Sequence, residues 1–164
     1  EGMSSAQKEA LHEMIGLGGL KYYLLKVDPQ KRMKFNPDES IELTGNTAPF
    51  IQYAHARIQS LLTKIGNDTC SEQLTLGTEE KNLVKVMVEF PKVVQEAGAS
   101  KSPAFVANYT YELVKQFNSF YQSVSIMNET DLSLKQTRIV ICQELAKIIS
   151  SAMQLLGIEV PNRM

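Results

Sequence analysis

The fold of this chain is decided by the stretch Asn46-Thr47-Ala48-Pro49-Phe50-Ile51-Gln52-Tyr53-Ala54-His55-Ala56-Arg57, in which a helix start leads into an aromatic and cationic stripe. Asn46 and Thr47 can each accept a backbone N–H at a helix N-terminus. Pro49 suits the first turn, where the amide hydrogen that it lacks has no partner within the helix. We therefore expect a helix to begin here.

Two stripes run along this predicted helix when successive residues are turned by about 100°. The core stripe is apolar and consists of Ile51, Ala54, Ile58, Leu61 and Ile65. A second stripe, rotated by roughly 80°, carries Phe50, Tyr53 and Arg57. Two rings and a guanidinium are the groups that stack unpaired bases and hold a phosphate. On spacing alone, a buried aromatic seam beside a solvated arginine is the more common arrangement.

The sequence before this stretch predicts one long helix and an irregular connection. Ser4 and Gln7 have the spacing of a capping box, and Asp28-Pro29 ends the helix that they begin. The segment 31–45 mixes apolar and polar residues without a helical period, which indicates a long crossing loop.

Three glycines, Gly16, Gly18 and Gly19, are expected to interrupt the first helix. A phosphate-binding loop would need a preceding strand and a following Lys-Ser/Thr, and neither is present. Close packing against another helix is the favoured interpretation.

The second half of the chain predicts three more helices. Thr78 opens one that Pro91 must kink or restart and that Gly98 ends. Ser102-Pro103 opens the next, and the last begins with a capping-box pattern near Ser133. The last helix reaches Leu156 before a Gly157 cap, and its apolar face is wide enough for the centre of a bundle. We predict a single all-α domain over residues 1–164, a bundle of about five principal helices.

Composition narrows the classes of function. The chain has 164 residues, 43% of them hydrophobic, a net charge of −1 and neither a long apolar run nor a signal-like start. We expect a soluble protein without a membrane span. Near-neutral charge argues against general binding of duplex DNA, but a module that reads a few unpaired bases can remain near neutral. Cys70, Cys142 and two histidines lack metal-binding spacing, so we expect two reduced thiols and no metal.

The opening stretch resembles the N-T-G-P-Y-x-Q-Y-A-H-A-R block of the anticodon-binding domain of arginyl-tRNA synthetases, with Ala48 in place of Gly and Phe50 in place of Tyr. The likeness continues in the stretch Gly16-Leu17-Gly18-Gly19-Leu20-Lys21-Tyr22-Tyr23-Leu24-Leu25 and in the terminal segment Leu155-Leu156-Gly157-Ile158-Glu159-Val160-Pro161-Asn162-Arg163-Met164. Tyr109-Thr110-Tyr111-Glu112-Leu113 and Phe117-Asn118-Ser119-Phe120-Tyr121 are similar to the family's Y-x-Y-x-L and F-x-x-F-Y patterns. The resemblance covers nearly the whole chain and implies the C-terminal, DALR-type domain of a class Ia synthetase.

The resemblance also implies a partner and a set of binding residues. The partner is the anticodon loop of arginine tRNA. Phe50 and Tyr53 would pack on bases or ribose, Arg57 would contact a phosphate or a base edge, and Tyr121 would cover the same pocket. Met164 would lie beside the loop, where its terminal carboxylate can accept a hydrogen bond from a base amino group. Phe50 lacks the usual hydroxyl, so stacking remains but a hydrogen bond worth about 1 kcal/mol is lost.

Catalysis is expected to lie outside this chain. The family's H-I-G-H-like and K-M-S-K-S-like elements are absent from the sequence, and no nucleophile is placed near His12 or His55. The resemblance implies a cytoplasmic parent protein whose separate nucleotide-binding domain attaches arginine to tRNA with ATP and Mg²⁺, while the present chain needs no cofactor. That catalytic domain would be a second partner.

Two other classes of function remain open. A helical protein-interaction domain without tRNA binding would show an exposed apolar patch in place of a basic, aromatic concavity. An autonomous enzyme would need a cluster of catalytic groups that the sequence does not display.

Overall fold

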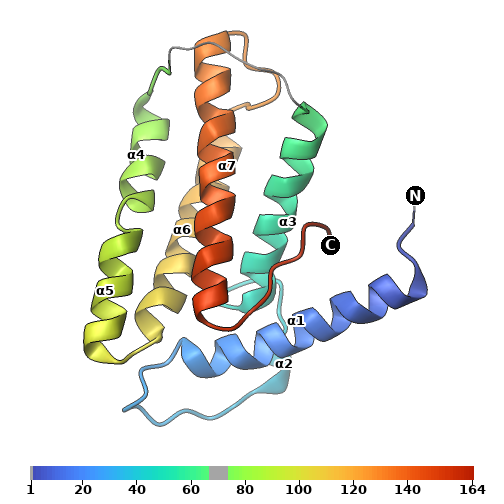
Figure 1. Cartoon of the computed structure of the whole chain (residues 1–164), viewed down its shortest axis with the longest axis vertical. Helices are drawn as coiled ribbons and strands as arrows, with labels where there is room; N and C mark the ends of the chain where they lie inside the picture. The colour runs from blue at the N-terminus through green and yellow to red at the C-terminus, as the bar shows by residue number, and fades with distance from the viewer. Residues whose placement is uncertain (1, 67–73) are drawn as a thin grey trace.

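The computed structural model describes residues 2–66 and 74–164 and is built from α-helices (Figure 1). In chain order the helices are α1 (Ser5–Leu25), α2 (Pro37–Ser40), α3 (Ala48–Ile65), α4 (Thr78–Met87), α5 (Phe90–Ser100), α6 (Ala104–Ser123) and α7 (Leu132–Leu155). The predicted all-α bundle is confirmed. The short α2 lies within the segment 31–45, which is otherwise irregular.

Local side-chain chemistry sets the helix starts. Ser4 and Gln7 form the predicted capping box at α1. Thr47 alone caps α3, with its hydroxyl oxygen accepting from the Phe50 backbone N–H. The predicted start of the last helix near Ser133 is wrong by two residues, because the Asp131 carboxylate accepts from the first free N–H groups. An aspartate at this position suits both the capping geometry and the positive end of the helix dipole.

The predicted third helix is two helices. α4 ends at Met87, and Pro91 lies in the first turn of α5. Of the two outcomes that the sequence allowed at Pro91, a kink or a new helix, the structure shows the new helix. The predicted end at Gly98 is wrong, because α5 continues to Ser100 and closes with Lys101 in the left-handed conformation at φ 52°. A left-handed residue commonly ends a helix, and here it is not glycine.

One apolar core joins the long helices. α7 packs against α3, α4 and α6, and its buried face confirms the central position predicted for it (Figure 1). The predicted core stripe of α3 is also confirmed, with Ile51, Ala54, Ile58 and Leu61 buried and Ile65 packed at the edge. Gly157 follows α7 at φ 67°, and the Ile158 N–H returns to the Met153 carbonyl at 2.9 Å, as expected of a glycine helix end.

Helix α1 crosses the foot of the bundle (Figure 1). The buried Tyr22 hydroxyl lies 2.6 Å from Asn46 Oδ1 and 2.7 Å from the Ala107 carbonyl oxygen, which ties α1 to the α3 start and to α6. Asn46 therefore joins helices and does not cap one. Burial raises the pKa of Tyr22 far above its usual value, so this hydroxyl stays protonated.

The glycines of α1 allow close packing. The prediction that they interrupt the helix is wrong, because α1 is continuous through them. A Cβ on Gly18 would come within 2.8 Å of Gln52 Nε2 on α3, and one on Gly19 within 2.7 Å of the Ser40 carbonyl oxygen. Close approach is thus confirmed for these two, whereas Gly16 has no neighbour within 4 Å of its Cβ position.

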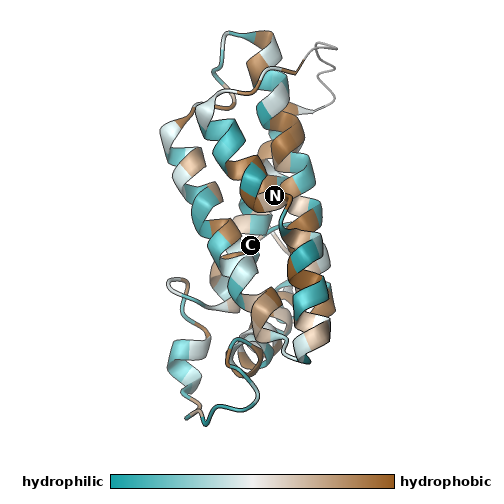
Figure 2. Cartoon of the chain, turned by 90° about the vertical axis from the view of Figure 1, so that its left-hand side faces the viewer, coloured by the Kyte–Doolittle hydropathy of each residue, from teal (hydrophilic) through white to brown (hydrophobic). Residues whose placement is uncertain are grey.

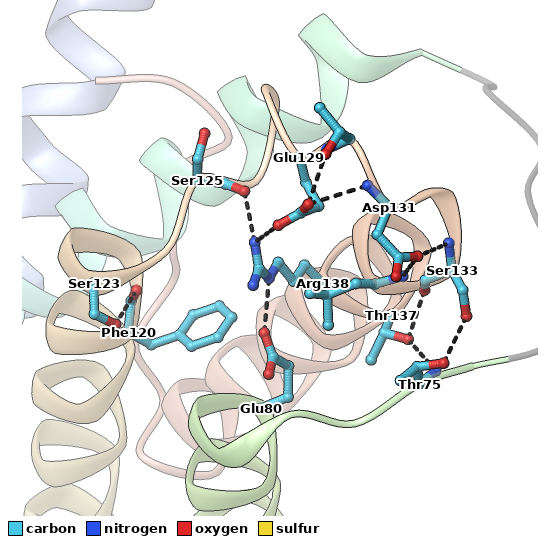
Figure 3. A network of polar contacts seen from close by, with 12 residues as sticks. Thr75, Glu80, Phe120, Ser123, Ser125, Glu129, Asp131, Ser133, Thr137 and Arg138 are labelled. Atoms are coloured by element: carbon cyan, nitrogen blue, oxygen red, sulfur yellow. Dashed lines mark hydrogen bonds and ion pairs between the residues drawn. The ribbon is translucent and has the colours of Figure 1, made fainter.

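The opposite end of the bundle is held by a buried ion network (Figure 3). Arg138 of α7 donates from Nε to Glu80 of α4 at 2.7 Å, and from Nη1 to Glu129 at 2.7 Å and to the Ser125 carbonyl at 2.8 Å. Arg138 and Glu80 are both buried. Backbone hydrogen bonds, led by that from Asp131, lower the pKa of Glu129 and keep it ionised. The network therefore fixes the loop between α6 and α7 to α4 and α7.

None of the helices in the described ranges is long and apolar enough to cross a bilayer. Within the same residues, no group of three or more histidine, cysteine, aspartate or glutamate side chains is arranged to hold a metal ion. Cys142 is a free, buried thiol, and burial raises its pKa to about 12. Cys70 lies outside the described residues, so the prediction of two reduced thiols remains a prediction.

Candidate nucleic-acid interface

The predicted aromatic stripe of α3 lies on the flank of that helix that faces α6. Tyr53 is 52% exposed, and Phe50 and Arg57 are partly exposed. The helical period produces this placement, because the three residues lie to one side of the buried stripe that begins with Ile51. The alternative of a buried aromatic seam is wrong for Tyr53, whose ring is open to solvent.

Helix α6 supplies the other half of this surface. The Arg57 guanidinium carbon lies 4.0 Å from the centroid of the Tyr121 ring, a cation–π contact between the two helices. The Phe50 and Tyr111 rings are 5.6 Å apart and tilted by 56°. We call the set Phe50, Tyr53, Arg57, Tyr111 and Tyr121 the aromatic flank. Tyr111 joins it although sequence reasoning did not select that residue.

The aromatic flank combines open ring surface with an available cation. Within the described part of the chain, no carboxylate pairs with Arg57. Lys115 lies 5.1 Å from the Tyr111 ring centroid and is paired with Glu112 at 3.0 Å on the same helix. The flank therefore offers the exposed ring of Tyr53, a guanidinium over an aromatic ring with no carboxylate partner among the described residues, and little net charge. This chemistry fits stacked bases with one phosphate or base edge beside them.

The last residues of the chain follow a different flank of α3 (Figure 1). Three side chains bind carbonyls of alternate tail residues: Lys21 Nζ binds that of Gly157 at 2.6 Å, Gln52 Nε2 that of Glu159 at 2.8 Å, and His55 Nδ1 that of Pro161 at 2.9 Å. We call these contacts the tail clamp. Gln52 and His55 lie on the side of α3 away from Arg57, as their positions along the helix require.

Met164 extends three residues beyond the clamp and is 37% exposed. The structure thus brings Phe50, Tyr53, Arg57 and Tyr121 together on the aromatic flank and places Met164 at the end of a tail held on the opposite flank of α3. Helical spacing does not indicate the carbonyls that Gln52 and His55 bind. Those carbonyls come from residues more than 100 positions away.

His55 has a structural place in this arrangement. Its Nδ1 must carry the proton because a carbonyl oxygen only accepts, and its Nε2 then accepts from Gln59 Nε2 at 3.4 Å. Burial lowers the pKa of His55, with the Pro161 hydrogen bond opposing that effect. This environment gives His55 a structural role, as a link between α3 and the end of the chain.

Residues 51–164 match the sequence model of the DALR anticodon binding domain family. This chain belongs to the DALR anticodon-binding domain family. The match begins within α3 and includes all of the aromatic flank except Phe50, which immediately precedes it.

The curated relatives of this DALR domain are arginine–tRNA ligases. It is 51% identical to the arginine–tRNA ligase of Flavobacterium psychrophilum and 48% identical to that of Parabacteroides distasonis, over 100% and 99% of its length. The domain spans 28% of each of those proteins. The relatives are therefore much longer than the chain described here.

Solved structures agree with the observed arrangement of helices. Arginyl-tRNA synthetase from Thermus thermophilus superposes with a TM-score of 0.90 at 27% identity, over 96% of this DALR domain and 28% of the synthetase chain. The synthetase from Plasmodium falciparum, at 23% identity, shares the fold with a TM-score of 0.83 over 94% of the domain. The resemblance inferred from the sequence is confirmed.

Proposed function

We propose that this DALR domain recognises the anticodon loop of an arginine tRNA through its aromatic flank. The observation that carries the proposal is Tyr53, a large ring left open to solvent beside a guanidinium that no carboxylate of the described residues neutralises. Exposed aromatic side chains at a site with few cations favour stacking on unpaired bases over attachment to a duplex backbone.

Each residue has a chemical role in this proposal. Tyr53 and Phe50 pack on anticodon-loop bases or ribose. Arg57 donates to a phosphate or to a base edge. Tyr121 covers the same pocket, and the centroid of its ring lies 4.0 Å from the Arg57 guanidinium carbon. Stacking on an aromatic ring is worth about 1–3 kcal/mol per base, so a few such contacts suffice for a module of low net charge.

Met164 contributes from the opposite flank of α3. The tail clamp fixes the backbone up to Pro161, and Met164 lies three residues beyond that last fixed carbonyl. We propose that an anticodon loop bound over the end of the tail contacts Met164. If the polypeptide ends at this residue, its carboxylate would accept a hydrogen bond from a base amino group. The loop would then contact α3 from both sides.

The activity of the parent protein is proposed from its relatives. The domain spans 28% of each arginine–tRNA ligase that it matches, which supports the proposal that it belongs to a longer polypeptide. Residues 1–164 would be the single anticodon-binding domain of that polypeptide. Its other part would activate arginine with ATP and Mg²⁺ in the cytoplasm and transfer it to tRNA. The DALR domain itself would take no cofactor.

Binding of the domain to an arginine tRNA anticodon stem-loop tests the proposal. We expect preference for this stem-loop over one with its central base changed, at low and at moderate salt. The salt dependence should be shallow because few phosphates are neutralised. Equal affinity for both stem-loops would contradict base recognition by the aromatic flank. A variant with residues appended after Met164 tests the terminal carboxylate, and unchanged affinity would remove that role.

A further inference from the structure

Helix α1 is apolar on two opposite faces. Its inner face carries the buried Tyr22 and the close packing at Gly18. Its outer face carries Leu17, Leu20 and Leu24, at the three- and four-residue spacing of one helical stripe, and these are 48%, 40% and 48% exposed. In Figure 2, where α1 is seen nearly end-on at the foot of the bundle, brown segments lie around its axis. A helix that is apolar all round is typically covered on both sides.

The neighbouring loop continues this surface. Phe35 packs edge-on against Tyr23 with ring centroids 5.2 Å apart, and Ile41 lies beside Gly19. Both Phe35 and Ile41 remain exposed. We call Leu17, Leu20, Leu24, Phe35 and Ile41 the α1 outer surface. Large apolar side chains left exposed on one helix and on the loop packed beside it mark a contact with another protein surface.

We propose that the α1 outer surface is the site at which the catalytic domain of the same polypeptide packs onto this DALR domain. The inference rests on the proposed function, because it requires that longer polypeptide. Two observations support this occupant. The domain spans only 28% of each relative, and the Thermus thermophilus superposition covers 96% of it, so the same helices occur within a much longer chain.

The chemistry of the surface argues against tRNA as its occupant. Leucine, isoleucine and phenylalanine side chains offer nothing to a phosphate backbone. The nearest lysine on α1, Lys21, is engaged in the tail clamp with the Gly157 carbonyl. The aromatic flank and the α1 outer surface are thus separate, one suited to nucleotides and the other to an apolar protein surface.

Thiol labelling measures whether the surface is covered. Leu20→Cys is made in a Cys70→Ser background, both in the 164-residue chain and in the full-length polypeptide that carries it, and its reaction with a maleimide is timed. Val88→Cys serves as the matched control because Val88 is also exposed and lies between α4 and α5, away from α1. We expect Leu20→Cys to react at least about tenfold more slowly in the full-length polypeptide than in the chain alone. The control should react equally in both.

Equal rates at Leu20→Cys in the two proteins would overturn the proposal, as would a gene that encodes no further domain. Slow labelling already in the chain alone, together with a dimer that Leu20→Lys dissociates, would overturn it in favour of a second copy. Labelling requires no tRNA. Equal labelling rates together with intact stem-loop recognition would therefore contradict this interface alone and leave the proposed function standing.

A charge substitution gives a second measurement. Leu20→Lys in the full-length polypeptide is expected to lower kcat/KM for arginylation at least about tenfold, because the anticodon and catalytic parts are no longer held in register. The same substitution in the chain alone should leave stem-loop affinity unchanged. Full activity of the Leu20→Lys polypeptide would contradict a packed interface at this residue.

Discussion

Two arginines in this bundle have opposite surroundings. Arg138 is buried between α4 and α7, and its guanidinium donates to two carboxylates and a backbone carbonyl (Figure 3). Arg57 is partly exposed with its guanidinium carbon 4.0 Å from the centroid of the Tyr121 ring, and no carboxylate of the described residues pairs with it. The first arginine has its hydrogen-bonding capacity largely used within the fold, whereas the second keeps donors free for a ligand.

This difference separates residues that stabilise the fold from residues that bind. A buried ion pair cannot lose one member without leaving an unpaired charge, so its loss is expressed as unfolding. An exposed stacked arginine contributes little to stability, so its loss is expressed in affinity. Each prediction below tests one side of that division.

The largest expected effect is that of Arg138→Ala. Removing the guanidinium leaves the buried Glu80 carboxylate unpaired, and we expect a loss of about 3–5 kcal/mol in the free energy of unfolding. Thermal unfolding should show a melting temperature lower by roughly 10 °C. Arg57→Ala is the matched control and should stay within about 1 kcal/mol of the parent, because it removes only a surface cation–π contact. A small effect of Arg138→Ala would show that the network is dispensable.

Tyr53→Ala should lower the affinity for the stem-loop and leave the stability of the fold nearly unchanged. The lost stacking surface is expected to weaken affinity for the arginine stem-loop by about 1–3 kcal/mol, as measured by titration. The melting temperature should hardly change because the ring is half exposed. Tyr53→Phe retains the ring and should bind like the parent chain. Marked unfolding of Tyr53→Ala would instead show that the ring supports the core.

The tail clamp predicts a pH dependence of stability. Burial lowers the pKa of His55 in the folded state below its usual value of 6.5, so the unfolded chain binds more protons between the two values. Stability should therefore be complete above about pH 6.5 and decline as the pH falls below it. His55→Gln should lose about 1 kcal/mol at neutral pH and show a shallower decline.

Melting curves from pH 8 to pH 5 measure this decline, with His12→Gln as the control because His12 is exposed on α1. An identical slope in the parent chain and in His55→Gln would assign the pH dependence to other groups.

The weakest interaction among these tests is the contact between Tyr121 and Arg57, which Tyr121→Leu removes. This substitution keeps an apolar side chain but removes the ring beneath Arg57, and a surface cation–π contact is worth about 0.5–1 kcal/mol. A double-mutant cycle with Arg57→Ala isolates the pairwise energy. A coupling energy that is near zero for unfolding but present for stem-loop binding would show that Tyr121 and Arg57 interact only when the ligand is bound.

Helix positions and the core were predictable because local signals set them. Each signal determines the structure of the few residues around it. Examples are the Thr47 cap, the apolar period of α3 and the position of Pro91. The predicted end at Gly98 was wrong because a glycine inside a helix costs only about 1 kcal/mol, and Lys101 took the left-handed position instead.

The candidate site was predictable only in part. The α3 half of the aromatic flank follows from helical period, and the family resemblance added Tyr121. Tyr111 and the carbonyl partners of Gln52 and His55 depend on how distant helices dock, which periodicity does not specify. The Arg138 network is of the same kind, because its partners come from α4 and from the loop before α7.

The tail clamp has a consequence for sequence change near the chain end. Lys21, Gln52 and His55 bind backbone oxygens and no tail side chain, so an exposed position such as Glu159 is free to vary. An inserted or deleted residue between Gly157 and Pro161 would instead shift every later carbonyl out of register with its donor and carry Met164 with it. In this segment of the protein, length is under tighter constraint than composition.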